Sequence, residues 1–116
     1  MLIADTHVHL YAMHDAARAM AAAHRQLTSG YHLSGDALIA LFLTEKSGDR
    51  AFDALRDGRR SAGPRFSPAT SGETNALRFS LNGGGPDLLV VAGRQLATAE
   101  GIEVLALGIA DALPDG

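Results

Sequence analysis

The spacing of apolar positions predicts two strand–helix units in the first half of the chain. Residues 2 to 8 form an apolar run that indicates a short buried strand, and residues 12 to 27 have apolar positions spaced as on one helical face. Residues 36 to 44 are nearly continuously apolar, as in a strand buried on both faces, and residues 48 to 58 indicate a short helix. This order favours an α/β fold with a parallel sheet and right-handed crossovers.

The second half of the chain follows a different pattern. Residues 59 to 75 are rich in Gly, Pro, Ser and Thr, which predicts a flexible surface loop. Residues 78 to 81 and 87 to 91 are expected to form the two arms of a β-hairpin, with "NGGGP" at 82 to 86 as its turn. Residues 101 to 110 predict a further strand.

Composition narrows the class of protein and of site. The 116 residues are 47% apolar and 20% charged, which is typical of one globular domain. A net charge of −3 gives no reason to expect a nucleic-acid or membrane partner, and without a leader or a long apolar run a cytoplasmic protein is expected. The chain has no cysteine, so a metal site would need imidazole and oxygen ligands.

The stretch "ADTHVHLY" places three polar side chains on alternating positions at the end of the first predicted strand. In a regular strand Asp5, His7 and His9 would point to the same face. Two imidazoles from one rigid element can bind a divalent metal such as zinc, manganese or iron, and Asp5 could orient one of them. The alternative is a pair of strand-end histidines that are hydrogen-bonded to the backbone.

Three segments together resemble the PHP-type metal-dependent phosphoesterases and, more distantly, the amidohydrolases. They are "IADTHVHLY", "IALFLTEK" and "LLVVAGRQLATAEGIEVLALG". The resemblance implies a partial β/α barrel, TIM-like and of PHP type, with an inserted β-hairpin. Because such barrels run to about 200 residues or more, residues 1–116 would be a single domain that corresponds to the N-terminal portion of one. The open sheet edges of such a partial barrel could pair with another copy, so self-association is a further expectation.

The same resemblance implies a set of metal ligands. His7 and His9 match the family's first ligand pair, while Glu45 and Lys46 stand where the family commonly has Asp-His. A glutamine stands in place of the glutamate of the family's Gly-x-Glu, and a glutamate falls near a position where the family often has histidine. The implied metal ligands are therefore His7, His9, Glu45, Gln95 and Glu103.

The function that follows is a metal-dependent hydrolase, a phosphoesterase acting on a small-molecule or phosphoester substrate through a metal-activated water. Asp5 and Arg94 are the catalytic candidates, the arginine either meeting a substrate anion or forming a surface salt bridge. Glu45 has a competing interpretation as a helix N-cap or surface charge. Two other functions stay open: a non-catalytic remnant or binding module on the same scaffold, and an amidohydrolase-type enzyme that cleaves C–N bonds.

Overall fold

The computed structural model describes residues 1–11, 15–30, 33, 36–46 and 48–108. These residues form two helices and seven strands in two sheets. In chain order the elements are β1 (Leu2–Val8), α1 (Ala16–Thr28), β2 (Leu38–Leu43), α2 (Ala51–Arg56), β3 (Phe66–Ala69), β4 (Ala76–Leu81), β5 (Asp87–Val91), β6 (Gly93–Ala97) and β7 (Glu103–Leu107).

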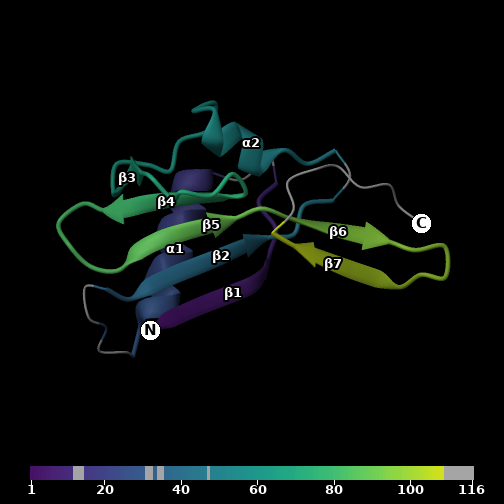
Figure 1. Ribbon diagram of the computed structural model, residues 1–116, viewed down its shortest axis with the longest axis horizontal. Coiled ribbons are helices and arrows are strands. Elements are labelled where there is room, and N and C mark those ends of the chain that lie inside the picture. The colour runs from purple at the N-terminus through teal and green to yellow at the C-terminus, as the bar shows by residue number, and fades with distance from the viewer. Residues whose placement is uncertain (12–14, 31–32, 34–35, 47, 109–116) are drawn as a thin grey trace.

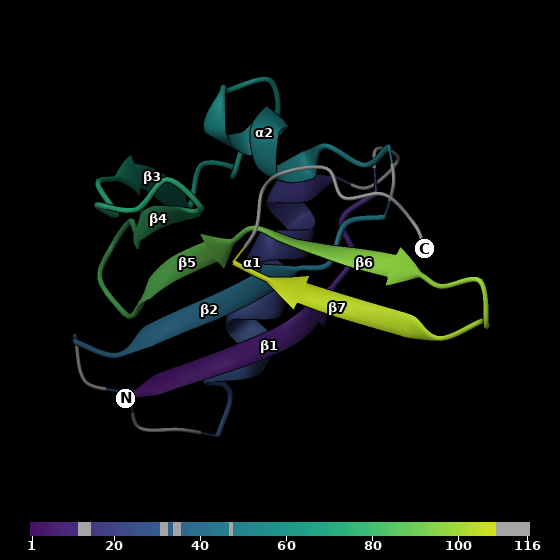
Figure 2. The same cartoon turned by 45° about the vertical axis from the view of Figure 1, so that its right-hand side comes forward.

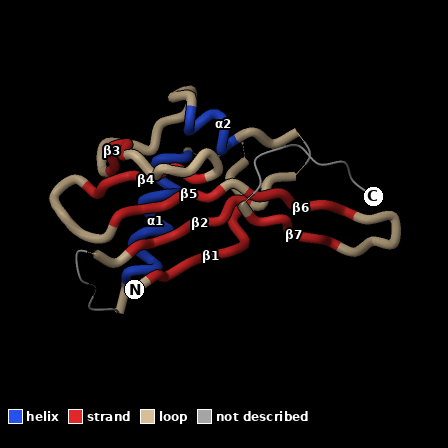
Figure 3. Tube along the Cα trace, in the orientation of Figure 1, coloured by secondary structure: helices blue, strands red, loops and turns tan. Residues whose placement is uncertain are grey.

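The larger sheet is open and mixed, with the strand order β1-β2-β5-β4-β3. Strands β1, β2 and β5 are parallel, whereas β5, β4 and β3 form an antiparallel meander. Helix α1 crosses one face of the parallel strands, and the β6–β7 hairpin extends away from the end of β2 and β5 (Figures 1 and 2). In the part of the chain that the structure describes, the remaining elements besides α1 and α2 are strands and loops (Figure 3).

The core lies between α1 and the sheet. On β2 the side chains of Ile39, Leu41 and Leu43 are buried, and they belong to one cluster with Met20 of α1 and Leu88 of β5. These are alternate positions along β2, as a strand with one face on a helix requires.

The predicted helix is confirmed from residue 16 onward. Asp15 caps α1, since its side chain accepts a hydrogen bond from the backbone N–H of Arg18 at 3.2 Å. The predicted start at residues 12 to 14 lies outside the described residues. The short helix predicted within residues 48 to 58 is confirmed as α2.

The expectation of a partial TIM-like barrel is wrong. A β/α barrel needs parallel strands that are each followed by a helix, but after α2 the described chain forms strands only. The turn at 82 to 86 sends β5 back antiparallel to β4, and β5 then takes the place next to β2. The sheet therefore stays open, with β1 and β3 at its edges, and no closed barrel forms among the described strands.

Two other predictions about the second half change as well. The hairpin with arms at 78 to 81 and 87 to 91 is confirmed, but it is not an insertion, because its second arm lies in the middle of the sheet. The predicted flexible loop at 59 to 75 contains strand β3, which pairs with β4 through Phe66 and Leu81. No helix among the described residues has the length and apolar character to cross a membrane.

Candidate metal centre

The end of β1 is irregular, and this irregularity sets the directions of the polar side chains. Asp5 pairs with Leu41 and Val8 with Leu43, so three steps along β1 correspond to two steps along β2. An extra residue of this kind is a β-bulge, which breaks the simple alternation of side chains. Asp5 Oδ1 accepts a hydrogen bond from the backbone N–H of His7 at 3.0 Å. The predicted role of Asp5 in orienting an imidazole is thus replaced by a backbone contact in the described structure.

The structure brings His7, His9 and Gln95 together. His7 Nε2 lies 3.1 Å from His9 Nε2 and 3.3 Å from Gln95 Oε1. The two imidazole rings meet edge to face, with 5.0 Å between their centroids and an angle of 61° between their planes. His7 Nε2 therefore contacts both the His9 ring and the amide oxygen of Gln95, a residue 88 positions further along the chain.

Strand β6 carries Gln95 to the histidines because it is held against the end of β2. The N–H of Glu45 donates to the carbonyl of Gly93 at 3.1 Å, and the N–H of Gln95 donates to the carbonyl of Glu45 at 2.9 Å. Gly93 is required for this approach, since a Cβ there would lie 2.3 Å from the carbonyl oxygen of Leu43. Gln95 is 6% exposed, so its amide is fixed in position.

The surroundings of His9 favour its neutral form. Burial lowers its pKa below 6.5, and the neighbouring charges of His7 and Lys46 lower it further, against the opposing effect of Asp49 and Glu103. Its ring stacks on Tyr11, with 5.5 Å between centroids and 4° between planes. Its Nδ1 is buried and has no hydrogen-bond partner among the described residues. A neutral imidazole is the form that binds a metal.

Glu45 is engaged elsewhere. Its Oε1 accepts a hydrogen bond from the backbone N–H of Phe52 at 2.8 Å, at the start of α2, and its Oε2 lies 3.3 Å from Arg94 Nη1. Both side chains of this ion pair are buried, at 4% and 5% exposed. These contacts agree with the alternative interpretation of Glu45, in which its carboxylate accepts a hydrogen bond from the N-terminus of a helix.

Arg94 and Glu103 also differ from their expected placement. The Arg94 guanidinium is buried against Glu45 and donates from Nη1 to the carbonyl of Asp49 at 3.0 Å, so it forms a buried ion pair and not a surface salt bridge. Glu103 lies exposed on β7 and acts on His9 through its charge. Among the described residues, no group of three or more His, Cys, Asp or Glu side chains is arranged to hold a metal ion. A site here therefore depends on the amide of Gln95.

Sequence reasoning missed Tyr11 and Asp49. Tyr11 continues the alternation of His7 and His9 along the chain, and that signal was available in the sequence. Asp49 has no such signal, because its influence on His9 depends on how the segment after β2 folds back.

The resemblance to the PHP-type phosphoesterases stays a prediction after comparison with known proteins. No protein-family model, no curated protein and no solved structure matches the chain.

Proposed function

We propose that His7, His9 and Gln95 bind a divalent metal ion, with zinc, manganese and iron as the candidates. The observation that carries this proposal is the approach of the two Nε2 atoms, 3.1 Å apart, with Gln95 Oε1 3.3 Å from His7 Nε2. Two nitrogens that each lie 2.0–2.1 Å from a tetrahedral zinc ion are separated by about 3.3 Å. The two nitrogens are therefore spaced as ligands of one ion would be, and the Gln95 oxygen lies at a similar distance from one of them.

The donor set fits this group chemically. Both histidines come from the end of β1, and the surroundings of His9 favour the neutral form, whose ring nitrogen offers a lone pair. The buried Nδ1 of His9 is the weak point of the fit, because ring nitrogens of metal ligands normally donate to an acceptor. A divalent ion bound by three neutral ligands would acidify a coordinated water, which is the chemistry that hydrolysis of a phosphoester needs.

Hydrolysis of a phosphoester is accordingly the activity we propose for this site. Lys46 contributes positive charge near His9, which favours an anionic substrate over a neutral amide. The amidohydrolase-type alternative has no comparable observation in its favour.

Metal content of the purified protein tests the proposal. We expect one equivalent of metal after reconstitution and dialysis, and its loss in a His7→Ala/His9→Ala variant. A His24→Gln variant removes a histidine whose Nε2 contacts the carbonyl oxygen of Pro86 and should retain the metal. Gln95→Leu should weaken binding by about 10-fold or more, since losing even a residue that only supports a metal ligand typically costs that much. Equal metal content in wild type and the His7/His9 variant contradicts the proposal.

One observation favours a non-catalytic binding module as the second candidate. The Glu45 carboxylate, at the end of β2, is buried and paired with Arg94. It therefore acts neither as a metal ligand beside the histidines nor as a general base. Stoichiometric metal binding without hydrolysis of p-nitrophenyl phosphate or its bis ester would select this candidate. Metal-dependent hydrolysis that disappears in the His7/His9 variant would select the enzyme.

A further inference from the structure

The β6–β7 hairpin presents one face of β7 to the candidate metal centre. Gln95 on β6 lies directly opposite Leu105 on β7. Side chains that lie directly opposite in an antiparallel pair are on the same face, with their Cβ atoms about 4.5–5.5 Å apart. Because Gln95 Oε1 lies 3.3 Å from His7 Nε2, the Leu105 side chain is next to the amide that contacts the histidines.

Glu103 and Leu107 lie on the same face of β7 as Leu105, because side chains two residues apart along a strand point the same way. Glu103 indicates independently where this face points, since its charge acts on the pKa of His9. Leu107 lies opposite Gly93, and its Cδ2 is 3.5 Å from the position that a Cβ of residue 93 would take. We call Glu103, Leu105 and Leu107 the β7 face.

The two leucines of the β7 face are exposed although they are apolar. Leu105 is 38% exposed and Leu107 is 41% exposed. Four of the six exposed large apolar side chains in the described part of the chain lie between residues 102 and 107. A concentration of exposed apolar groups beside a few polar ones is typical of a ligand-binding surface.

The charges around the centre favour a ligand with one anionic group. Besides burial and His7, the groups that act on the pKa of His9 are Lys46, Asp49 and Glu103. Lys46 is positive and the other two are negative, so together they oppose an accumulation of negative charge. A divalent ion at the histidines leaves a small net positive charge, which one anionic group of a substrate can balance.

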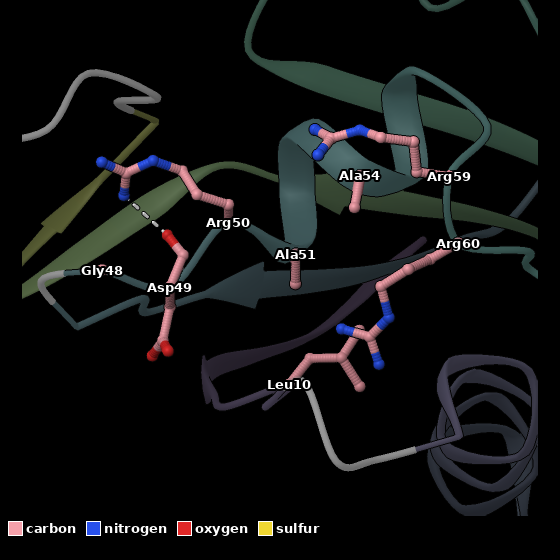
Figure 4. A pocket seen from close by; sticks show the side chains of 8 residues that line it. All are labelled: Leu10, Gly48, Asp49, Arg50, Ala51, Ala54, Arg59 and Arg60. Carbon is pink, nitrogen blue, oxygen red and sulfur yellow. Dashed lines mark hydrogen bonds between the residues drawn. The ribbon is translucent and has the colours of Figure 1, made fainter.

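The arginines around α2 do not converge on this centre. Figure 4 shows Arg50, Arg59 and Arg60 pointing in different directions around that helix. Arg50 Nη1 donates to the carbonyl of Asp49 at 2.8 Å, and Arg59 Nη2 lies 3.4 Å from Asp57 Oδ2. The positive charge that we assign to the centre is therefore that of Lys46 and of the bound ion.

We propose that the β7 face binds the organic part of the substrate, and that this part is an apolar aryl or alkyl group on a single phosphoryl group. This inference rests on the metal site proposed above: the phosphoryl group lies at the ion, and the apolar group lies on Leu105 and Leu107. Removal of both apolar surfaces from water stabilises the complex. Glu103, at the outer end of the face, repels a second anionic group.

Amide shifts of ¹⁵N-labelled, zinc-loaded protein test the inference. The probes are phenylphosphonate and methylphosphonate, which share the anionic group and have a C–P bond in place of the ester bond, so hydrolysis plays no part. We expect both to shift the amides of residues 7, 9 and 95, and phenylphosphonate alone to shift those of residues 103, 105 and 107. The Kd of phenylphosphonate should be at least tenfold lower, which corresponds to about 1.4 kcal/mol.

Two double variants separate the two faces of the hairpin. Leu105→Ser/Leu107→Ser should reduce the ratio of the two Kd values to less than threefold. Ile102→Ser/Val104→Ser is the matched control, because it also removes two exposed apolar side chains, 60% and 44% exposed, but from the opposite face, so the ratio should stay at least tenfold. 4-Carboxyphenylphosphonate should bind at least threefold more weakly than phenylphosphonate, and Glu103→Gln should remove that difference.

The outcomes separate this inference from the metal site. Wild-type protein that does not retain zinc contradicts the metal site and the inference with it. Zinc-loaded protein that binds both phosphonates with equal affinity overturns the inference alone, and so does an equal loss in the two double variants. The amide spectrum shows directly whether each variant is folded.

Discussion

Replacing Arg94 by methionine should destabilise the protein far more than its position on a projecting hairpin implies. The substitution leaves the Glu45 carboxylate, 4% exposed, without its ionic partner. Removing one member of a buried ion pair typically costs about 3–5 kcal/mol, because the remaining charge stays desolvated. The hydrogen bond to the carbonyl of Asp49 is lost as well. Against a total stability of about 5–15 kcal/mol, this loss is a large fraction of the free energy of unfolding.

Urea unfolding followed by circular dichroism measures this loss, with two comparison variants. Arg78→Met removes the arginine of the more exposed pair with Asp87, whose side chains are 40% and 24% exposed, and should cost about 0–1 kcal/mol. Glu45→Gln/Arg94→Met removes both charges and keeps an oxygen for the N–H of Phe52, so it should be more stable than Arg94→Met alone. A loss in Arg94→Met no larger than in Arg78→Met, or no recovery in the double variant, refutes the assignment of a buried ion pair.

Three further predictions concern the strand ends and the open edge. Gly93→Ala places a Cβ 2.3 Å from the carbonyl oxygen of Leu43, so β6 must shift; thermal unfolding should show a lower Tm, and an unchanged Tm contradicts the close approach. The lowered pKa of His9 means that its contribution to stability is complete above pH 6.5 and decreases as the pH falls below that value. Urea unfolding between pH 5 and 8 should show this slope in wild type and a smaller one in His9→Gln, and identical slopes contradict it. Finally, β1 forms a sheet edge with Leu2 60% exposed, so the proposed self-association should give concentration-dependent sedimentation that Leu2→Lys reduces.

Local patterns predicted the elements that depend on local physics. The apolar runs of β1 and β2, the amphipathic α1 and the "NGGGP" turn between β4 and β5 all have signals within a few residues. The predicted burial of β1 is wrong, because β1 lies at the sheet edge and its residues are exposed or half-buried. The partner of each strand has no such signal. Strand β5 lies next to β2 because the β3–β4–β5 meander returns there, and β3 itself was hidden in a segment whose Gly, Pro and Ser content indicates a loop.

The candidate site also contains some features that the local sequence predicts and others that it does not. His7 and His9 lie two residues apart, so the sequence predicts that they lie close together. The bulge after Asp5 has no such signal in the sequence. Gln95 was placed near them only through a family resemblance. Glu45 forms an ion pair with Arg94 and a hydrogen bond with the N–H of Phe52 because α2 begins close to the end of β2. No sequence pattern around residue 45 specifies that arrangement.

The neutrality of the three proposed ligands has a chemical consequence. A divalent ion held by two imidazoles and an amide keeps its full charge of +2, whereas a carboxylate in place of either ring would reduce it. The Glu45 carboxylate is committed to Arg94, and Glu103 acts on His9 through charge alone. The charge that completes such a site must then come largely from what it binds. An anion meets that need, and Lys46 supplies positive charge near His9. The buried ion pair and the neutral ligand set thus favour the same class of substrate.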